Sequence, residues 1–348
     1  MKRNNRRIAA FAAVALMAGL GLTACGDDSD SGSDGGSGSG DGGSSGATFT
    51  FLPKNLGNPY FDTSDAGGEK AIKEFGGKYE QVGPDAGSPD AQVPFINTAA
   101  QQGVGALVVS ANDPKAICDA LDEASSAGTK IVTFDSDTDP ECRDLFINQA
   151  TAEGIAKAQV DLIADQIGDK GEVAILSAAA AATNQNAWIE LMKTDLAENH
   201  PDIKLVDVVY GDDDDQKSFD LTAALLADHP DLKGIISPTT VGIAAAARYL
   251  STSDAKGKVA LTGLGTPNQM RDYVEDGTVT EFALWNPGDL GYLAAFAAKA
   301  LVDGDITGEE GDSFTAGDLG DFEVGADATV LLGDPFKFNA DNIGDFNF

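Results

Sequence analysis

Three consecutive amide side chains, Asn184, Gln185 and Asn186, follow a run of alanines in the stretch SAAAAATNQNAWI, and Trp188 comes two residues later. Amide side chains lose rotamer freedom when they are ordered, and they cost free energy when they are buried without partners. The triplet therefore indicates a bound ligand or a capping role. Its chemistry suits hydroxyl groups, because an amide both donates and accepts hydrogen bonds.

Similar side chains follow several other short apolar runs, each of which is typical of a β-strand. Carboxylates and amides form paired hydrogen bonds with adjacent hydroxyls, and aromatic faces offer flat apolar contact to the C–H face of a pyranose. Any one of them can instead cap a helix or close a turn, but their recurrence at six strand ends favours a site for a small polyol or sugar. The candidates are Lys54, Asn58, Tyr60, Phe61, Asp135, Asp137, Asn184, Gln185, Asn186, Pro238, Thr239, Thr240, Trp285 and Asn286.

The elements that must position these residues alternate regularly from Thr48 onward. Short β-rich runs such as ALVVS, KIVTF, EVAIL and LKGIIS are separated by segments with helical patterns. Repeated βα units predict an α/β fold with parallel, doubly wound sheets and helices on both faces. In such sheets ligands bind beyond the carboxyl ends of the strands, where the candidate residues lie.

The two histidines have a structural interpretation. The tripeptide His-Pro-Asp occurs at His200 and again at His229, each time between a helical pattern and a strand. Proline disfavours helix at the residue before it, so both tripeptides predict helix ends. Neither histidine has a second histidine or a cysteine nearby in the sequence, and we therefore expect no metal site.

Longer motifs resemble the sugar-binding proteins of ABC importers in the ribose-binding superfamily, the type I periplasmic binding proteins. The resemblance runs from about Thr48 to the C-terminus and is carried by KNLGNPYF, VVSANDP, TFDSDTDPECRDLFINQAT, TNQNAWI, SPTTVGIAAAARYL, TGLGTPNQM, FALWNPGDLGY and DPFKFNADNIG. It implies two Rossmann-like lobes joined by three crossings, with a ligand closed between them. The crossings are expected near Asn148, Trp285 and Thr315, which gives an N-terminal lobe of 48–148 and 285–315 and a C-terminal lobe of 149–284 and 316–348.

The same resemblance implies roles for the candidate residues. Asn58, Tyr60 and Phe61 would lie on the N-terminal lobe, where Asp135 would hold adjacent hydroxyls of the sugar. The residues that would close from the other side are Asn184 to Asn186, Pro238 to Thr240, and Asn286 at the hinge. Of the two tryptophans, Trp285 is the better candidate for the cleft, whereas Trp188, one helical turn after Asn184, is expected in the core.

Within the superfamily the chain most resembles rhamnose-binding proteins, and next the Lsr-type receptor for the furanosyl signal autoinducer-two. It shares Lys54, Asp135, Gln185 and Pro238 with the signal receptor. It departs from that receptor at Asn184, where the receptor has an acid, and at Thr240, where the receptor has an alanine. TNQN and PTTVG fit the rhamnose-binding pattern, whereas DSDTDPECR is shared more with the signal receptor. The resemblance favours L-rhamnose and leaves autoinducer-two as the alternative.

The first residues predict export and anchoring. Residues 1–24 have a basic start, a short apolar middle and a small-residue end, which is the pattern of a signal peptide. Leu22-Thr23-Ala24-Cys25 resembles a lipobox, which implies cleavage before Cys25 and a lipid on its sulfur; a plain signal peptide is the alternative. Residues 25–47 are rich in Gly, Ser and Asp and predict a flexible linker. The expected location is the outer face of the cell membrane.

The charge of the chain limits the partners that it can bind, and its cysteine content limits the covalent links that it can form. The net charge of −33 becomes about −37 when the four basic residues at the start are removed, and so acidic a surface repels nucleic acid. A neutral monosaccharide is the easier ligand, and the family implies an ABC permease with its ATPase subunit as further partners. Of the cysteines other than Cys25, Cys118 and Cys142 lie in neighbouring βα units and either pair as a disulfide or remain two buried thiols.

The sequence favours calcium binding and catalysis less than it favours sugar binding. Asp212 to Asp215 lack the ligand spacing, the central glycine and the final glutamate of an EF-hand, so a solvated turn and helix cap are favoured over calcium. There is no Gly-x-Ser-x-Gly elbow, and neither His200 nor His229 stands near a cysteine nucleophile. Asp135 and Asp137 could serve as the paired acids of a glycosidase, but an enzyme is the function that the sequence favours least. We expect a monomeric binding protein without a cofactor.

Overall fold

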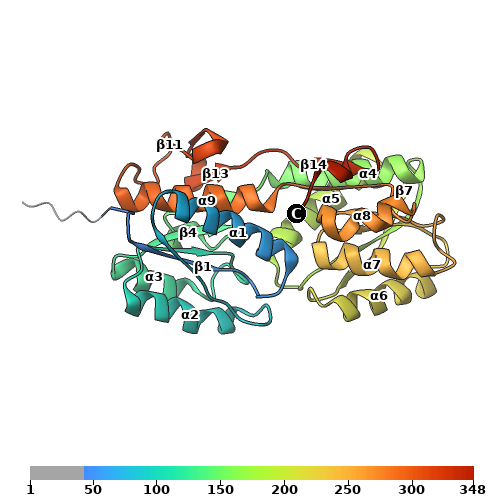
Figure 1. Cartoon of the computed structure of the whole chain (residues 1–348). Coiled ribbons are helices and arrows are strands. Elements are labelled where there is room, and N and C mark those ends of the chain that lie inside the picture. Colours follow the sequence, from blue (N-terminus) through green and yellow to red (C-terminus); the bar gives the residue numbers. More distant parts are fainter. Residues whose placement is uncertain (1–42) are drawn as a thin grey trace, which may run out of the picture. The chain divides into compact units, whose positions relative to one another are not determined.

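The computed structural model describes residues 43–348. The predicted signal peptide, Cys25 and most of the predicted linker lie outside the described residues. Within residues 43–348, no helix is both long enough and apolar enough to cross a membrane. The described chain forms two α/β lobes, and the polypeptide passes between them three times (Figure 1).

The N-terminal lobe is built on a six-stranded sheet in which every neighbouring pair is parallel. The strand order is β13-β5-β4-β3-β1-β2. The central strands are apolar and fully buried because helices cover both faces of the sheet. Its strands are β1 (Thr48–Leu52), β2 (Lys78–Gln81), β3 (Ala106–Val109), β4 (Lys130–Phe134), β5 (Leu145–Asn148) and β13 (Thr329–Leu331).

Four helices flank this sheet in two pairs. One pair, α1 (Pro59–Glu74) and α9 (Pro287–Asp303), packs together over one face, and the other pair, α2 (Pro89–Gln102) and α3 (Cys118–Ser126), lies on the opposite face (Figure 1). The antiparallel hairpin of β11 (Ser313–Thr315) and β12 (Asp321–Glu323) packs near α9. Single 3₁₀ turns lie at Pro140–Cys142, Gly317–Leu319 and Ala326–Ala328.

The C-terminal lobe has a parallel sheet of order β7-β6-β8-β9, and an isolated parallel bridge between Leu264 and Ala283 continues it to an antiparallel pair, β10 and β14. Helices α4 and α5 cover one face, and α6 and α7 cover the other. The strands are β6 (Gly171–Ser177), β7 (Ile203–Tyr210), β8 (Leu232–Ser237), β9 (Ala260–Gly263), β10 (Glu281–Leu284) and β14 (Phe336–Asn339). The helices are α4 (Ala152–Ile167), α5 (Thr183–Asn199), α6 (Asp215–Asp228), α7 (Thr240–Thr252) and α8 (Pro267–Glu275), with a 3₁₀ turn at Ile343–Asp345.

Three segments connect the lobes. The chain leaves the N-terminal lobe after β5 and enters α4, and it returns between β10 and α9, at Trp285 and Asn286. The predicted boundary after Thr315 is wrong. Strand β13 pairs in parallel with β5, and Val330 is fully buried in the N-terminal sheet, so the third crossing follows Leu331 and precedes β14. A three-residue edge strand carries too short a pattern to be recognised from sequence.

The packing of α1 against α9 depends on glycine. A Cβ atom added to Gly291 would lie 1.8 Å from the carbonyl oxygen of Ser64, and one added to Gly67 would lie 1.9 Å from that of Gly288. The two backbones therefore approach more closely than any side chain allows. Since α9 begins directly after the second crossing, this contact fixes the start of α9 against α1, which carries Tyr60 and Phe61.

A disulfide joins Cys118, at the start of α3, to Cys142, in the 3₁₀ turn before β5. The two Cα atoms are 5.3 Å apart and the residues are separated by 24 positions in sequence. The sequence left a disulfide and two separate thiols open, and this structure has the disulfide. It ties the helix after β3 to the segment that follows β4, close to the strand end that carries Asp135.

Candidate ligand-binding site

A pocket lies between the two lobes, at the carboxyl ends of strands from both sheets. It contains about 400 Å³ of space outside protein atoms, its mouth included. The lining residues are Lys54, Asn58, Tyr60, Phe61, Asp135, Asn184, Gln185, Trp188, Asp213, Pro238, Thr239, Thr240, Leu264, Leu284 and Trp285. Of the fourteen predicted site residues, all but Asp137, Asn186 and Asn286 are among them.

Asp135 is the most heavily bonded carboxylate of the pocket. Tyr60 donates its hydroxyl hydrogen bond to Oδ1 at 3.1 Å, and Ser110 donates to Oδ2 at 2.8 Å. The ammonium of Lys54 lies 3.9 Å from Oδ2. Asp135 follows β4 with a φ of 62°, in the left-handed region that non-glycine residues rarely adopt. These contacts hold a carboxylate at a fixed orientation with lone pairs left for a ligand.

Burial and the neighbouring negative charge of Asp135 raise the pKa of Tyr60 well above its usual value. The phenol is therefore neutral at physiological pH and acts as a hydrogen-bond donor. Tyr60 also accepts a hydrogen bond from the indole nitrogen of Trp285 at 2.9 Å. A chain of hydrogen bonds thus runs from Trp285 at the second crossing, through Tyr60 on α1, to the carboxylate of Asp135.

Asn184 connects the two lobes directly. Its amide nitrogen donates to the main-chain oxygen of Asp135, and its amide oxygen accepts from the ammonium of Lys54, both at 3.4 Å. The same oxygen also accepts from the main-chain nitrogen of Gln185 at 2.9 Å. An amide can serve both neighbours at once because it carries a donor and an acceptor. An acid at this position would lose the donor that reaches Asp135.

The three amides have three different environments. Gln185 is buried, and its side-chain oxygen accepts from the hydroxyl of Ser177 at 2.7 Å and the main-chain nitrogen of Ala178 at 2.8 Å. The amide nitrogen of Gln185 has no hydrogen-bond partner within residues 43–348 and is free to donate to a ligand. Asn186 instead donates to the carbonyl of Ala180 at 2.8 Å and lies outside the pocket. The first two amides of the triplet therefore line the pocket, and the third closes the turn before α5.

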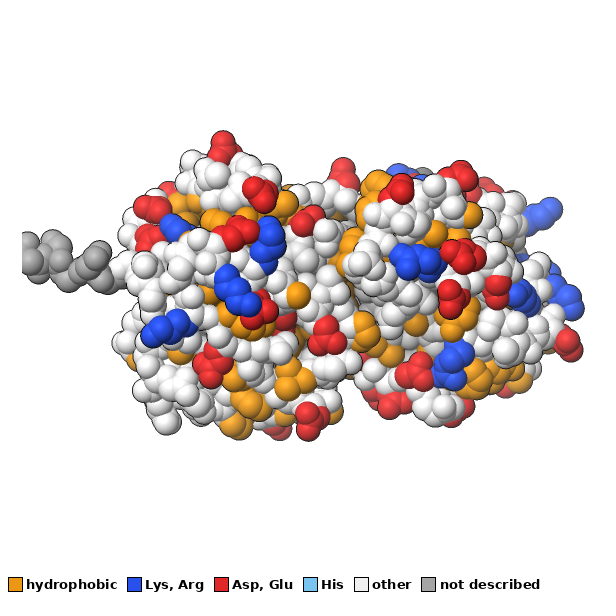
Figure 2. Space-filling model, viewed as in Figure 1, with side chains coloured by type: hydrophobic (Ala, Val, Ile, Leu, Met, Phe, Trp, Pro, Cys, Tyr) orange, Lys and Arg blue, Asp and Glu red, His pale blue; other side chains and the backbone are white. Residues whose placement is uncertain are grey.

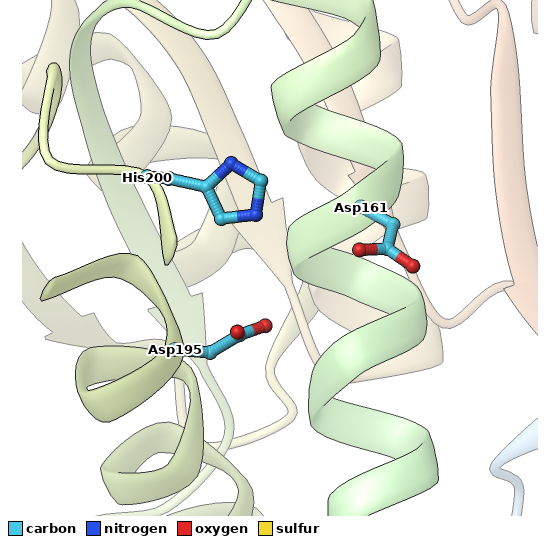
Figure 3. A group of neighbouring side chains, drawn as sticks. All are labelled: Asp161, Asp195 and His200. Atoms are coloured by element: carbon cyan, nitrogen blue, oxygen red, sulfur yellow. The ribbon is translucent and has the colours of Figure 1, made fainter. Parts of the chain in front are cut away.

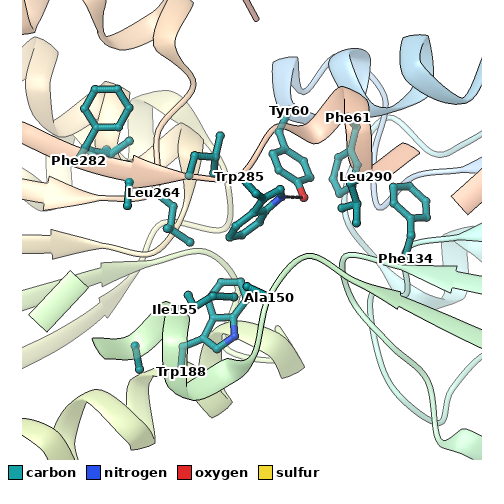
Figure 4. Close-up of a cluster of buried hydrophobic side chains, with 14 of the residues drawn as sticks. Tyr60, Phe61, Phe134, Ala150, Ile155, Trp188, Leu264, Phe282, Trp285 and Leu290 are labelled. Carbon is teal, nitrogen blue, oxygen red and sulfur yellow. Dashed lines mark hydrogen bonds between the residues drawn. The ribbon is translucent and has the colours of Figure 1, made fainter. Parts of the chain in front are cut away.

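Aromatic rings form the apolar wall of the pocket. Trp285 packs edge to face with Tyr60, at 6.1 Å between ring centroids, and at 6.2 Å with Trp188 (Figure 4). Trp188 was expected in the core; it is buried there, yet its ring also lines the pocket. Leu264 and Leu284 complete the wall from the C-terminal lobe. Rings in this arrangement suit the C–H face of a small cyclic ligand.

Asp213 is a pocket residue that the sequence analysis missed. It accepts a hydrogen bond from the hydroxyl of Thr239, and its φ of 52° again lies in the left-handed region. Its removal from solvent raises the pKa of the Asp213 carboxyl. In the sequence, only its position three residues after the end of β7 indicates a pocket residue. Asp213 stands in a run of four acids, and such a run is typical of residues that face solvent. Ser110, directly after β3, was missed as well.

The other three acids of that run have ordinary structural partners. Asp212 pairs with Lys217, Asp215 pairs with Arg248, and Asp214 caps α6 by accepting from the main-chain nitrogen of Lys217. The expected turn and helix cap are therefore present. The four carboxylates do not converge in the manner of a calcium loop, because one turns toward the pocket and the others pair with cations or backbone.

Asp137 and Asn286 are predicted site residues that the structure places elsewhere. Asp137 is two residues beyond Asp135 and turns to the other side, where the guanidinium of Arg143 holds it through two bonds of 2.7 Å. Asn286 caps α9, and its side-chain oxygen accepts from the main-chain nitrogen of Gly288 at 2.9 Å. Both predictions are corrected here for the same reason: a local partner satisfies each side chain outside the pocket.

The surface carries charge of both signs without a broad basic area on the face drawn in Figure 2. Lys and Arg side chains there lie singly or in small groups among Asp and Glu. Most of the described cations pair with carboxylates, as Lys70 does with Glu74 and Lys73 with Glu69. This distribution gives the face no footprint for a polyanion.

Comparison with known proteins agrees with this architecture. Residues 49–306 match the periplasmic binding protein domain family. A sugar ABC transporter structure from Actinomyces odontolyticus is 55% identical, with a TM-score of 0.73, over 87% of this chain and 98% of that chain. An ABC transporter solute-binding protein from Clostridium phytofermentas, solved with bound L-rhamnose, is 41% identical, with a TM-score of 0.83, over 87% of this chain and 98% of that chain.

LsrB from Clostridium saccharobutylicum, solved in complex with AI-2, is 27% identical, with a TM-score of 0.81, over 86% of this chain and 100% of that chain. These similarities confirm the predicted family and the predicted α/β fold of two lobes with parallel sheets. The chain therefore belongs to the periplasmic binding protein domain family and has the type I fold that is found in sugar-binding proteins of ABC transporters.

Proposed function

We propose that this protein is the extracytoplasmic solute-binding component of an ABC sugar importer and that its ligand is L-rhamnose. The observation that carries the proposal is the pocket between the lobes, where Asp135 is held by Tyr60, Ser110 and Lys54 opposite an aromatic wall. A fixed carboxylate binds two adjacent hydroxyls, and the wall covers the apolar face of the ring. We propose no catalytic role for these residues.

The chemistry of the wall supports a deoxy sugar. L-Rhamnose is 6-deoxy-L-mannose, so one corner of its ring carries a methyl group. Leu264 and Leu284 are both at most 2% exposed and line the C-terminal side of the pocket. A methyl group can bury itself against leucine side chains without cost, whereas a hydroxyl there loses its hydrogen bonds to water. The relative solved with L-rhamnose, which is 41% identical, supports the same choice.

Binding by hinge closure follows from the placement of the ligand groups. Asn58, Tyr60, Phe61 and Asp135 come from the N-terminal lobe, and Asn184, Pro238 and Thr240 come from the C-terminal lobe. A ligand that contacts both lobes binds the closed form more tightly than the open one, and it shifts the population toward closure by that difference. The closed form would then dock to the permease. A monomer is sufficient, because both halves of the pocket come from one chain.

The proposed location is the outer face of the membrane, with Cys25 as the lipid attachment site after removal of residues 1–24. Two acyl chains give stable anchoring, whereas one gives only marginal binding. Mass spectrometry of the purified membrane form tests this step. A mass consistent with a lipidated N-terminal Cys25 supports it, and an unmodified chain that begins after another residue contradicts it.

Calorimetry with a panel of ligands tests the ligand assignment. We expect L-rhamnose to bind with a Kd of about 1 μM or tighter, which corresponds to about −8 kcal/mol. L-Mannose is the matched control ligand, since it differs only by the 6-hydroxyl, and it should bind at least about 5-fold more weakly because that hydroxyl is buried against leucine. Ribose and galactose serve as further comparisons. No binding of any sugar would contradict the proposal as a whole.

Autoinducer-two is the second candidate. Lys54, Asp135, Gln185 and Pro238 all line the pocket, and they are the positions in which this chain resembles the signal receptor. The relative solved with AI-2 has a similar fold at lower identity, 27%. Tighter binding of autoinducer-two than of L-rhamnose in the same panel would identify a signal importer.

A further inference from the structure

A histidine and two aspartates converge on the C-terminal lobe, away from the sugar pocket. Asp161 comes from α4, Asp195 comes from α5, and His200 is the residue that ends α5. One ligand atom from each lies within 4.8 Å of the others. Figure 3 shows Asp195 and His200 on one side and Asp161 on the facing helix, with their polar groups turned toward a common space.

His200 is oriented for a ligand by a third carboxylate, that of Asp169. Its Nδ1 lies 2.6 Å from Oδ1 of Asp169. A carboxylate on one ring nitrogen holds the proton there and leaves the other nitrogen with a free lone pair, which is the usual arrangement of metal-binding histidines. In Figure 3 the second ring nitrogen faces the side on which Asp161 and Asp195 lie. The imidazole is therefore already presented as a donor atom toward the two acids.

Asp195 provides an independent observation. Its Oδ2 is fully buried and has no hydrogen-bond partner among residues 43–348. The other oxygen, Oδ1, accepts from the side-chain nitrogen of Asn199 at 2.6 Å. A buried carboxylate oxygen without a partner is costly, because it has lost its water and gained nothing in return. A cation between the three side chains would satisfy it.

Asp161 has a competing partner that a metal ion can tolerate. Lys157 pairs with Oδ1 of Asp161 at 2.7 Å, one helical turn away, and its side chain is 66% exposed. Exposed pairs of this kind contribute little, so Lys157 can move into solvent at small cost. The carboxylate then has both oxygens for an ion.

We propose that Asp161, Asp195 and His200 bind a divalent transition-metal ion of the Zn²⁺ type. One imidazole nitrogen and two carboxylates form a donor set that zinc accepts, with water as a fourth ligand, whereas Ca²⁺ prefers six to eight oxygen atoms. Around a tetrahedral ion with bonds of about 2.0–2.1 Å the ligand atoms lie about 3.4 Å apart. Small side-chain rotations bring the three atoms from their present separation to that distance.

The sequence predicts no metal site, because a pattern of ligands along the chain reveals only residues that are close together in sequence. The three ligands are separated by 34 and 5 positions, and only the packing of α4 on α5 brings Asp161 beside the other two. The ion would join the two helices that cover one face of the C-terminal sheet. Since all three ligands belong to one lobe, the ion is expected to stabilise that lobe without taking part in hinge closure.

The second His-Pro-Asp tripeptide provides a matched control. His229 ends α6 as His200 ends α5, but it faces a single carboxylate, Asp207, at 3.6 Å. Replacement of either histidine by glutamine removes the same chemical group from the same kind of helix end. Only the replacement at 200 removes a ligand of the proposed site.

The test is zinc calorimetry on full-length protein purified in detergent and stripped with a chelator. We expect one Zn²⁺ per chain, at least about 10-fold weaker binding in His200→Gln and Asp195→Asn, and unchanged binding in His229→Gln. Lys157→Gln should bind at least as tightly as wild type, since it removes the competing cation. An excess of Ca²⁺ should not displace the zinc.

Two outcomes overturn the proposal. Equal zinc affinity in wild type and His200→Gln would mean that scattered surface acids of this chain, whose net charge is −33, account for the binding. Displacement by Ca²⁺ would mean the same.

Thermal unfolding with and without Zn²⁺ gives a second measurement, in which His229→Gln and wild type should gain stability and His200→Gln should not. Sugar affinity should be the same in all four variants, so the metal site and the sugar site fail or succeed separately.

Discussion

The indole nitrogen of Trp285 donates a hydrogen bond to the phenol oxygen of Tyr60 at 2.9 Å, although the two residues are 225 positions apart in sequence. Tyr60 in turn donates to Asp135 at 3.1 Å. Trp285 stands at the second crossing between the lobes, so a residue of the hinge holds the phenol in the orientation that the carboxylate requires. This relationship couples the geometry of the hinge to the geometry of the pocket.

Replacement of Tyr60 by phenylalanine removes the hydroxyl that links Trp285 to Asp135, and it keeps the aromatic ring. We expect ligand affinity to fall by about 10-fold, because the loss of a hydrogen bond to a charged group costs about 1.5 kcal/mol or more. Calorimetry with L-rhamnose measures the change. Tyr79→Phe is the control, since Tyr79 lies on the edge strand β2, packs on Phe51 and does not line the pocket. An unchanged affinity in Tyr60→Phe would show that Asp135 is positioned without the phenol.

Asp135→Ala should weaken ligand binding more than Asn184→Asp. The first change removes the carboxylate that we expect to hold two hydroxyls, and the second keeps an oxygen that can face Lys54 and loses only the donor to Asp135. Titration of both variants with the same ligand decides the order. Asn186→Ala should bind as wild type does, because Asn186 is bonded to Ala180 outside the pocket. Equal affinities in wild type and Asp135→Ala would place the site elsewhere.

Asp65 predicts a pH dependence of stability. It is 2% exposed on α1, and burial raises its pKa to about 7, although hydrogen bonds from Gln81 and Ser64 oppose the shift. In the unfolded chain the carboxyl titrates near 4, so the folded state binds the extra proton between about pH 4 and 7. This group's contribution is therefore fully present at low pH and is lost as pH rises through 7, by up to about 4 kcal/mol.

Urea unfolding at pH 5 and pH 7.5 measures this effect. Wild type should lose more stability than Asp65→Asn over that interval, because asparagine cannot ionise. Asp62→Asn, at an exposed position one turn earlier on the same helix, should behave as wild type does. If wild type and Asp65→Asn change by the same amount, the carboxyl of Asp65 titrates as an exposed acid does.

Gly291→Ala tests the close packing of α1 and α9. The new methyl group would overlap the carbonyl of Ser64, so the helices must separate, and we expect a loss of about 1–3 kcal/mol. Gly344→Ala is the matched control, since a Cβ there meets nothing within 4 Å. Denaturant unfolding compares the two. A stability in Gly291→Ala close to that of the control would mean that α9 can shift freely over α1.

The Cys118–Cys142 disulfide should contribute to stability by restricting the unfolded chain. For a loop of 24 residues, chain entropy gives about 3 kcal/mol. The double variant Cys118→Ala/Cys142→Ala should therefore unfold at lower denaturant than wild type under oxidising conditions and at a similar concentration under reducing ones. Thiol labelling of the unreduced, unfolded protein gives a direct check, because reaction at both cysteines would show that they are not bonded.

The sequence by itself determined the family, the two-lobed α/β fold and most of the pocket. Its alternation of short apolar runs with helical patterns is a local property, and the carboxyl edge of a parallel sheet is a position that follows from that alternation. Lys54, Asp135 and Trp285 could be placed there because each comes within two residues of the end of such a run. The resemblance of the motifs to a known family added the order of the lobes and the first two crossings.

Only the tertiary structure decided which side chain at each strand end faces the ligand. Asp137 and Asp213 are both acids near strand ends, but Arg143 turns one away while Thr239 turns the other inward. The same holds for β13, which pairs with β5, a strand 183 positions earlier in the sequence. The partners in each case come from distant segments, and local residue patterns carry no information about which distant groups will meet. The convergence of Asp161, Asp195 and His200 has the same origin.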